Sequence, residues 1–315
     1  MKQKYKEFAK KENLPIFMQP SWLDSVCQNG MEWDVILYEK GGEIWGSFVY
    51  VIKKKFGFTL ITMPKLTQFL GPYIKYPKGQ KYYKKLSWEK EIMNYFIDNL
   101  PKFDYFNMNF HYSITNWLPF YWRGFKQTTR YTYVIENLNN LDNVFNNFDN
   151  SYKNKIRKAK KNIEIKRGLT IEKFYYMNKL TFERQGIRIP YSLEFLKLHD
   201  NVLISHNARE IFYAIDKEGN IHSSLYLTWD NFSSYVHMVG EDPNLRKSGA
   251  GILLVWEAIK YTKKILELNK FDFEGSIIES IEQVRRSFGA VQKPYFNIIK
   301  PNHLFKIIEC IRQYR

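Results

Sequence analysis

The segment Arg246-Lys247-Ser248-Gly249-Ala250-Gly251 combines residue types that can hold a negatively charged ligand. A strand-like run from Ser234 to Val239 precedes it, and a helical run from Ile252 to Lys264 follows it. The two glycines let the backbone approach an anion closely, successive N–H groups can point into one concavity, and the helix N-terminus adds its positive end. Arg246 and Lys247 supply full charges. The sequence therefore predicts a phosphate-binding loop.

Two better-known nucleotide motifs do not fit this loop. A P-loop requires Gly-Lys-Ser/Thr, whereas Gly251 is followed by Ile252 and Leu253. A dinucleotide fingerprint would need a third glycine where Leu254 stands. A glycine-rich turn that merely starts a helix remains the structural alternative.

Two stretches of the sequence follow the same order of elements, and they start at Glu91 and Ala258. Each begins with an amphipathic helical stretch, reaches a Phe-Asp-aromatic triplet, continues through a second helix, and ends in a glycine followed by an aromatic-rich strand. The triplets are Phe103-Asp104-Tyr105 and Phe271-Asp272-Phe273, and the glycines are Gly124 and Gly289. The offset between the triplets nearly equals that between the glycines, which indicates one duplicated unit.

Strand-like runs precede the helices in both halves. The run WDVILYEKGGEIWGSFVYVIKK alternates apolar residues around a turn at Glu39 to Gly42, which predicts a β-hairpin. The run REIFYAIDKEGNIHSSLYLTWDNFSSYVHMVG predicts three strands, with turns at Lys217 to Asn220 and Trp229 to Asn231. The expected fold class is α/β, with two similar domains at 1–150 and 151–315, each a mixed twisted sheet flanked by helices.

Composition and charge narrow the class of protein. A length of 315 residues suggests two domains, and 44% hydrophobic residues allow each a core without disulfides or metal. No metal site is predicted. The N-terminus has no apolar signal-like run and no stretch is long enough to span a bilayer, so we expect a cytoplasmic protein.

The net charge of +16 points to an anionic partner or substrate. An abundance of Lys, Asn, Ile and Tyr that AT-rich coding DNA would produce explains it equally well. The segment from Ser151 to Gly168 concentrates this charge and predicts a helix with Ile156, Ala159 and Ile163 facing inward. Its lysines form either a solvated face or a clamp for a phosphate-bearing substrate.

The pattern R-x-x-G-x-G between a strand and a helix resembles the acyl-CoA pyrophosphate loop of the GNAT superfamily. The tandem arrangement, with FDFEGS at Phe271 to Ser276, RRSFGA at Arg285 to Ala290 and the basic stretch IRKAKKN, resembles FemAB-like and BioF2-like acyltransferases of bacteria. The resemblance spans most of the chain and is strongest from about residue 150 onward. It implies acyl transfer to an amine. The N-terminal half has no comparable loop, so we expect that this half has lost donor binding and shapes the acceptor pocket. The implied donor-binding residues are Met238, Val239, Arg246, Lys247, Ser248, Gly249, Ala250 and Gly251.

Acyl transfer to an amine needs a neutral nucleophile, a stabiliser for the developing oxyanion and a proton source for the leaving group. His237 lies on the strand that leads into the loop and has a side chain suited to proton transfer near neutral pH. Glu241 ends that strand. Glu274 follows the Phe271 to Phe273 strand, at the edge where open α/β sheets place their ligands, and is the first candidate for the base or the acceptor-orienting group.

Arg285 stands four residues before Gly289. Many GNAT enzymes carry a tyrosine at the corresponding position, where it protonates the leaving thiolate, and Fem-like enzymes tend to have a lysine. Arg285 cannot act as an acid at neutral pH, but it can stabilise an oxyanion or bind phosphate.

The leading hypothesis is an N-acyltransferase that moves an acyl group, first of all acetyl, from acyl-CoA to an amine of a cell-envelope or polysaccharide precursor, either a small molecule or lipid-linked. The first alternative is a Fem-like aminoacyltransferase that uses aminoacyl-tRNA and acts on a peptidoglycan precursor. The second is a non-catalytic protein that binds nucleic acid or an anionic membrane surface. The first two differ in the donor, acyl-CoA or tRNA.

Overall fold

The computed structural model of the chain describes residues 1–275, 277–302 and 305. It divides into two compact units, of which unit 1 comprises residues 1–130 together with the described residues from 294 onward, and unit 2 comprises the described residues of 131–293. Ser276, the last residue of the FDFEGS motif, lies outside the described residues.

Unit 1 holds a mixed sheet with helices around it. Its elements are α1 (Lys2–Glu12), the 3-10 helix η1 (Ile16–Met18), α2 (Pro20–Val26), β1 (Met31–Lys40), β2 (Glu43–Lys55), β3 (Phe58–Ile61), β4 (Gly71–Ile74), α3 (Tyr82–Asp98), β5 (Tyr105–Asn109) and α4 (Leu118–Trp122). Strand β2 pairs antiparallel with β1, β3 and β4, whereas β3 pairs parallel with β5. The predicted hairpin is therefore confirmed as β1–β2.

The core of unit 1 is aromatic. Phe48 of β2 lies against Phe96 of α3, Phe106 of β5 and Phe120 of α4, and all four rings are fully buried. Because every one of these strands and helices contributes a ring to the same cluster, burial of these rings fixes how α3 and α4 pack on the sheet.

Unit 2 repeats this architecture. Its elements are α5 (Leu141–Asn146), α6 (Asn150–Ala159), β7 (Glu164–Arg167), α7 (Ile171–Arg184), α8 (Leu193–Ser205), β8 (Arg209–Ile215), β9 (Ile221–Trp229), β10 (Ser234–Glu241), the 3-10 helix η2 (Arg246–Ser248), α9 (Ala250–Lys264), β11 (Phe271–Asp272) and α10 (Glu279–Ser287). Strands β7 to β10 form an antiparallel meander, and β10 pairs parallel with β11.

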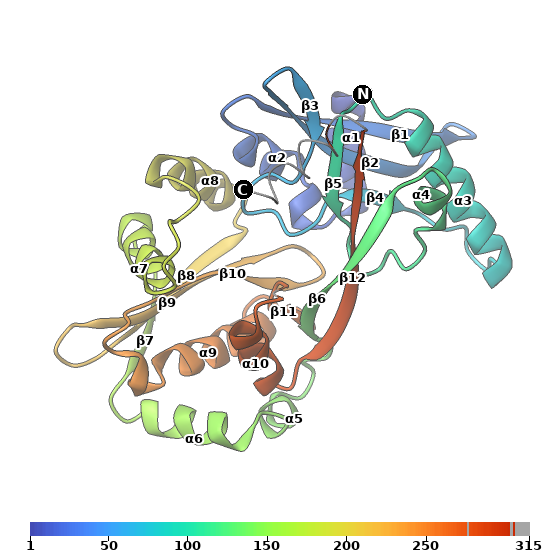
Figure 1. The fold of residues 1–315 in the computed structure, drawn as a ribbon. Helices are drawn as coiled ribbons and strands as arrows, with labels where there is room; N and C mark the ends of the chain where they lie inside the picture. Colours follow the sequence, from blue (N-terminus) through green and yellow to red (C-terminus); the bar gives the residue numbers. More distant parts are fainter. Residues whose placement is uncertain (276, 303–304, 306–315) are drawn as a thin grey trace. The chain divides into compact units, whose positions relative to one another are not determined.

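Helices cover both faces of the unit 2 meander. Helix α9 packs on β8 and β9, and α7 packs on β9 and β10 from the opposite side (Figure 1). Seven consecutive residues of β9, from His222 to Thr228, are accordingly buried. A strand buried on both faces loses the alternation of apolar and polar residues that marks a half-exposed strand.

The last strand of each duplicated stretch pairs within the other unit. Strand β6 (Lys126–Ile135) follows α4, yet its end pairs antiparallel with β11 of unit 2. Strand β12 (Val291–Pro301) follows α10, yet Asn297 to Pro301 pair with β5 of unit 1. The compact units therefore differ from the ranges 1–150 and 151–315 drawn from the sequence, because pairing across the sheet outweighs order along the chain.

The duplicated order of elements is present in full. Helix α3, strand β5, helix α4, Gly124 and β6 repeat as α9, β11, α10, Gly289 and β12, and both glycines have positive φ. The basic segment is only partly helical, because α6 ends at Ala159 and β7 follows. Ile156, Ala159 and Ile163 are buried as predicted.

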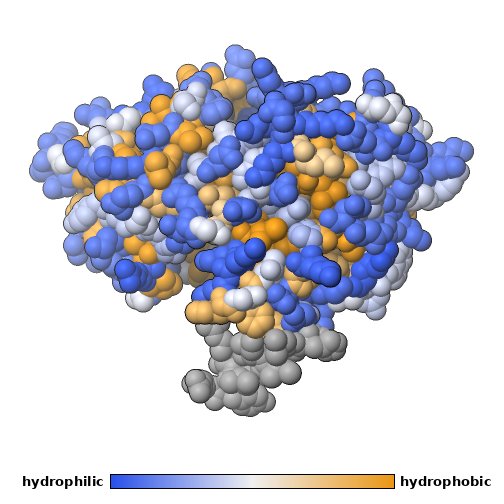
Figure 2. All heavy atoms as spheres, turned by 90° about the horizontal axis from the view of Figure 1, so that it is seen from above, coloured by the Kyte–Doolittle hydropathy of each residue, from blue (hydrophilic) through white to orange (hydrophobic). Residues whose placement is uncertain are grey.

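Hydrophilic side chains dominate the face seen in Figure 2, with hydrophobic ones at the surface in several places between them. Within the described part of the chain, no helix is long and apolar enough to cross a bilayer.

Candidate active site

Strands β10 and β11 diverge soon after they meet. They pair only at Ser234 with Phe271 and at Tyr235 with Asp272, after which β11 ends while β10 continues to Glu241. The pairing of β10 with β9 is irregular at His237, between Val236 and Met238. A bulge of this kind turns a side chain in a new direction. Here it turns His237 toward the chain that leaves β11.

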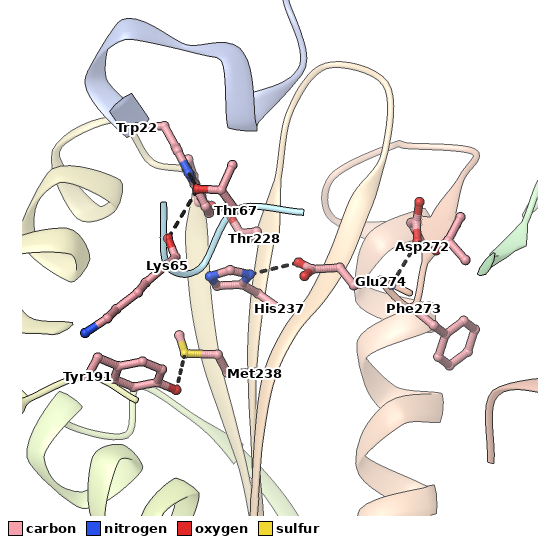
Figure 3. A network of polar contacts seen from close by, with 12 residues as sticks. Trp22, Lys65, Thr67, Tyr191, Thr228, His237, Met238, Asp272, Phe273 and Glu274 are labelled. Atoms are coloured by element: carbon pink, nitrogen blue, oxygen red, sulfur yellow. Dashed lines mark hydrogen bonds and ion pairs between the residues drawn. The ribbon is translucent and has the colours of Figure 1, made fainter. Parts of the chain in front are cut away.

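A buried polar cluster occupies this point of divergence (Figure 3). His237 Nδ1 lies 2.8 Å from Glu274 Oε1. Asp272 Oδ1 accepts the backbone N–H of Glu274 at 2.8 Å and the hydroxyl of Thr132 at 2.6 Å. Glu274 has φ of 52°, a conformation that is uncommon for residues other than glycine. Asp272 thus holds the strained backbone that aims Glu274 at His237.

Burial sets the protonation of this cluster. The His237 side chain is 1% exposed and that of Glu274 is 15% exposed. Loss of hydration lowers the pKa of His237 to about 3, raises that of Asp272 to about 7, and raises that of Glu274 well above its ordinary value. Arg285 opposes the shift at Glu274 without reversing it. At neutral pH the favoured state is therefore a carboxylic acid hydrogen-bonded to a neutral imidazole.

Arg285 supports the cluster from α10. Its Nε donates to the backbone oxygen of Phe273 at 3.0 Å, so it braces the residue directly before Glu274. His199, fully buried on α8, lies with its ring centroid 6.0 Å from that of His237, and burial lowers its pKa well below the usual value. The cluster thus extends from a braced turn into the core of unit 2.

Helix α7 engages the end of β10, where the donor was expected to lie. Asn178 Nδ2 donates to the carbonyl of Val239 at 2.6 Å, and the backbone N–H of Glu241 donates to Thr181 Oγ1 at 2.9 Å. Tyr191 donates to Asn178 Oδ1 at 2.7 Å and contacts the sulfur of Met238 at 3.3 Å. Two backbone groups at the end of β10, the Val239 carbonyl and the Glu241 N–H, are therefore already hydrogen-bonded to side chains of α7.

Glu241 lies beside the predicted phosphate loop. Its carboxylate accepts Arg246 Nε at 2.5 Å, and a Cβ added to Gly251 would lie 3.2 Å from Glu241 Oε1. The N-terminus of α9 favours this negative charge. Arg246, which was expected to bind donor phosphate, is thus paired with a carboxylate that occupies part of the same space.

The glycines of the loop meet needs of the fold itself. Gly249 has φ of 76°, and a Cβ there would lie 3.4 Å from the backbone oxygen of Lys155 on α6. At Gly251 a Cβ would also lie 3.4 Å from Ser223 Oγ. The loop therefore packs closely on its own unit, and the glycines alone do not argue for a bound phosphate. Lys247 of this loop is exposed, whereas Ala250 is buried.

Hydrogen bonds through His222 link the predicted phosphate loop to the β8–β9 hairpin. His222 Nδ1 lies 2.9 Å from Ser248 Oγ, and His222 Nε2 lies 2.9 Å from Asp216 Oδ2. The order Asp-His-Ser resembles that of a hydrolytic triad. Ser248 Oγ also accepts the backbone N–H of Ala250 at 3.2 Å, so its contacts tie the turn before α9 to the β8–β9 hairpin.

Two open pockets lie in unit 2. One, of about 440 Å³, borders Ser248 and His222 and is flanked by Lys158 of α6, and the other, of about 490 Å³, lies between α7 and the β8–β9 turn. Neither is lined by Glu274 or His237. In the described ranges, no three His, Cys, Asp or Glu side chains are grouped so that they could hold a metal ion.

The sequence pointed to Glu274, His237, Glu241 and Arg285 separately, and the structure brings Glu274, His237 and Arg285 into one cluster while Glu241 pairs with Arg246. Sequence reasoning missed Asn178, Thr132 and the His222 chain. Most of their contacts join residues far apart along the chain, such as Asn178 with Val239 and Thr132 with Asp272.

No protein-family model and no curated protein matches the sequence. Solved structures do match in fold. A structure of FemX is 15% identical, with a TM-score of 0.70 over 94% of this chain and 95% of that one. The structure of L-PGS from Bacillus licheniformis is 9% identical, with a TM-score of 0.55 over 98% and 94% of the two chains. A tandem GNAT protein from the clavulanic acid biosynthesis pathway is 8% identical, with a TM-score of 0.52 over 89% and 93%.

These likenesses establish the fold. The chain has the tandem GNAT fold of FemAB-like proteins, which confirms the predicted α/β class and the resemblance noted in the sequence.

Proposed function

We propose that the protein is an acyltransferase that acylates an amine of a cell-envelope precursor, and that its donor is an aminoacyl ester of the Fem-like kind, aminoacyl-tRNA, rather than acyl-CoA. The observation that carries the reaction type is the buried Asp272–Glu274–His237 cluster at the divergence of β10 and β11. The acyl-CoA reading, our first expectation from the loop motif, becomes the second candidate.

The donor proposal rests on the observation that groups with which an acyl-CoA would pair are already paired within the protein. Arg246 is neutralised by Glu241, and the Val239 carbonyl accepts Asn178. A pyrophosphate bound to this loop would have to displace the Glu241 carboxylate from Arg246. If the carboxylate stayed in place, it would repel the pyrophosphate. The fold match to FemX, which has the highest TM-score of the three structures compared, points the same way.

In the proposed reaction the amine nitrogen attacks the ester carbonyl carbon, and the carbon–oxygen bond to the ribose hydroxyl of the donor breaks. The leaving oxygen needs a proton and the attacking nitrogen loses one. Glu274, protonated because burial raises its pKa, gives its proton to the leaving oxygen, and the nitrogen's proton returns to the Glu274–His237 pair. Arg285 and Asp272 keep Glu274 in position.

A ligand titration tests the donor. Acetyl-CoA, CoA and uncharged tRNA are titrated separately against the wild type and the Glu241→Gln variant, and the rise in melting temperature is recorded. A ligand that binds the folded state stabilises it by RT ln(1 + [L]/Kd). We expect tRNA to stabilise the wild type, and acetyl-CoA to act measurably only on Glu241→Gln, in which Arg246 is released.

The matched control is Asp242→Asn, which removes a neighbouring carboxylate that does not pair with Arg246. Strong stabilisation of the wild type by acetyl-CoA, unchanged in Glu241→Gln, would restore acyl-CoA as the donor and reject the occupied-loop argument.

A further inference from the structure

The two-residue turn between β2 and β3 in unit 1 contains a residue type that such turns disfavour. Lys55 pairs with Phe58, which leaves Phe56 and Gly57 as a two-residue loop. Both have positive φ, 50° and 79°, the combination of a type I′ turn. The first position of such a turn favours Asn, Asp or Gly, because a larger side chain is strained there. A phenylalanine at this position therefore works against folding.

Burial of the Phe56 side chain does not offset this strain. The Phe56 side chain is 87% exposed, the largest exposure among the large hydrophobic residues that the structure describes. Lys55 Nζ lies 5.3 Å from the centroid of the Phe56 ring. A strained and exposed aromatic residue is accounted for if its side chain is buried when the protein binds a partner.

The charge around the turn identifies the kind of partner. Lys53, Lys54 and Lys55 precede Phe56 directly, and from Ile44 to Trp88 the sequence contains lysines but no Asp or Glu. Successive residues of a strand point to opposite faces, so the three lysines surround the tip on both sides of the ribbon with the aromatic ring at its apex. This arrangement suits entry end-on into a surface covered with phosphates.

We propose that the β2–β3 turn is a membrane anchor, in which Phe56 enters the interfacial layer of an anionic lipid bilayer while Lys53, Lys54 and Lys55 contact lipid phosphates. Aromatic rings favour the interface of a bilayer, and each lysine near an anionic surface strengthens binding about fivefold. A single-stranded nucleic acid is less well matched, since it binds flat stacking platforms along a groove rather than an apex. The inference is independent of the donor and of the reaction.

The test is vesicle co-sedimentation of the full chain with phosphatidylcholine vesicles that contain phosphatidylglycerol, and with phosphatidylcholine alone. We expect binding to the anionic vesicles only, weakened by added salt. Phe56→Asn should lower the partition coefficient about tenfold, and Lys54→Gln about fivefold. Asn suits positive φ, so Phe56→Asn should melt at or above the wild-type temperature, which separates lost binding from lost folding.

The matched control is Phe232→Asn, because Phe232 is also an exposed phenylalanine, 53% exposed, in a turn whose contacts are with Asp230 rather than with lysines. Its partition should equal that of the wild type. Absence of binding to anionic vesicles, or equal loss in Phe56→Asn and Phe232→Asn, would overturn the proposal. Binding of uncharged tRNA that Phe56→Asn abolishes, with vesicle binding absent, would overturn it in favour of a nucleic acid.

Discussion

Two aspartates occupy matching places in the duplicated stretches and are used differently. Asp104, half-buried before β5, accepts the backbone N–H of Thr59 at 2.8 Å and the amide of Asn302 at 2.6 Å. Asp272, fully buried in β11, accepts Thr132 and the backbone N–H of Glu274. Both tie a strand to its neighbour. Only the second one positions a titratable side chain, since Phe106 stands in the first stretch where Glu274 stands in the second.

The helices that begin these stretches differ in the same way. Helix α9 starts at a basic, glycine-containing loop whose Ser248 hydroxyl lies 2.9 Å from His222 Nδ1, whereas α3 starts after Lys81, and the N-cap residue of neither helix makes a side-chain capping bond. The duplicated scaffold is thus present in both halves, and the residues that we propose to act chemically lie in the second half.

Glu274→Gln should have the largest effect on activity. It keeps the shape of the side chain but removes the acid, so the transfer rate should fall by about 10²- to 10⁴-fold, the usual contribution of general acid–base catalysis. Glu279→Gln, on the exposed first turn of α10, should keep the wild-type rate. Equal rates in the two variants would remove Glu274 from the mechanism.

Asp272→Asn tests the buried carboxyl through stability. Its pKa is raised to about 7, so the protein gains its full contribution below the unfolded pKa and loses it as the pH rises from about 4 to about 7. A difference of about 3 pKa units corresponds to about 4 kcal/mol. Relative to Asp272→Asn, the wild type should lose stability across this range in urea unfolding. His237, with its lowered pKa, contributes the opposite slope, which cancels between the two proteins.

The matching variant Asp104→Asn is the control for this pH dependence. Asp104 is half-buried and accepts two hydrogen bonds, so its variant reports the loss of such bonds at the matching position without the full burial of Asp272. A wild type whose stability relative to Asp272→Asn stays constant between pH 4 and 7 would show that Asp272 is ionised when folded.

The glycine turns at matching places in the two duplicated stretches allow a paired test of stability by substitution with alanine. Gly124 and Gly289 have φ of 77° and 68°. An added Cβ meets nothing within 4 Å at Gly124, but at Gly289 it would lie 2.8 Å from the backbone oxygen of Asn147. Gly124→Ala should cost about 1–2 kcal/mol from strain alone. Gly289→Ala should cost about 1–3 kcal/mol more in a denaturant titration, because backbone must move.

Ser248→Ala should give the smallest effect. It removes the hydrogen bonds that the Ser248 hydroxyl makes with the Ala250 N–H and with His222, for a loss of about 1 kcal/mol in thermal unfolding. Lys81→Ala, at the equivalent start of α3, should change stability by less than about 0.5 kcal/mol, since Lys81 makes no capping bond. A similar loss in both variants would mean that the anchored loop adds nothing to its half.

Much of the fold could be predicted from local sequence. The β1–β2 turn at Gly41 and Gly42, the β8–β10 meander and the repeated Phe-Asp and glycine positions are short-range signals, and the structure confirms the elements they indicated. The limits of the compact units could not be read this way. Strands β6 and β12 pair with β11 and β5, partners that are distant in sequence.

The sequence singled out candidate site residues but did not indicate their contacts. Strand-end position pointed to Glu274 and His237 separately. Their hydrogen bond depends on the short β10–β11 pairing and on the strained backbone of Glu274, which Asp272 holds. The pairing of Arg246 with Glu241 and that of Asn178 with Val239 arise from packing of α7 and the loop, and these contacts changed the favoured donor.

A single-turnover transfer assay tests the central claim most directly. Labelled aminoacyl-tRNA and labelled acetyl-CoA are offered in parallel, with a peptidoglycan precursor that carries a free amine as the acceptor, to the wild type and to Glu274→Gln. The account predicts that label moves from the aminoacyl-tRNA to the amine with the wild type and at least a hundredfold more slowly with the variant. Transfer from acetyl-CoA at a rate that Glu274→Gln leaves unchanged, with aminoacyl-tRNA inert, would contradict it.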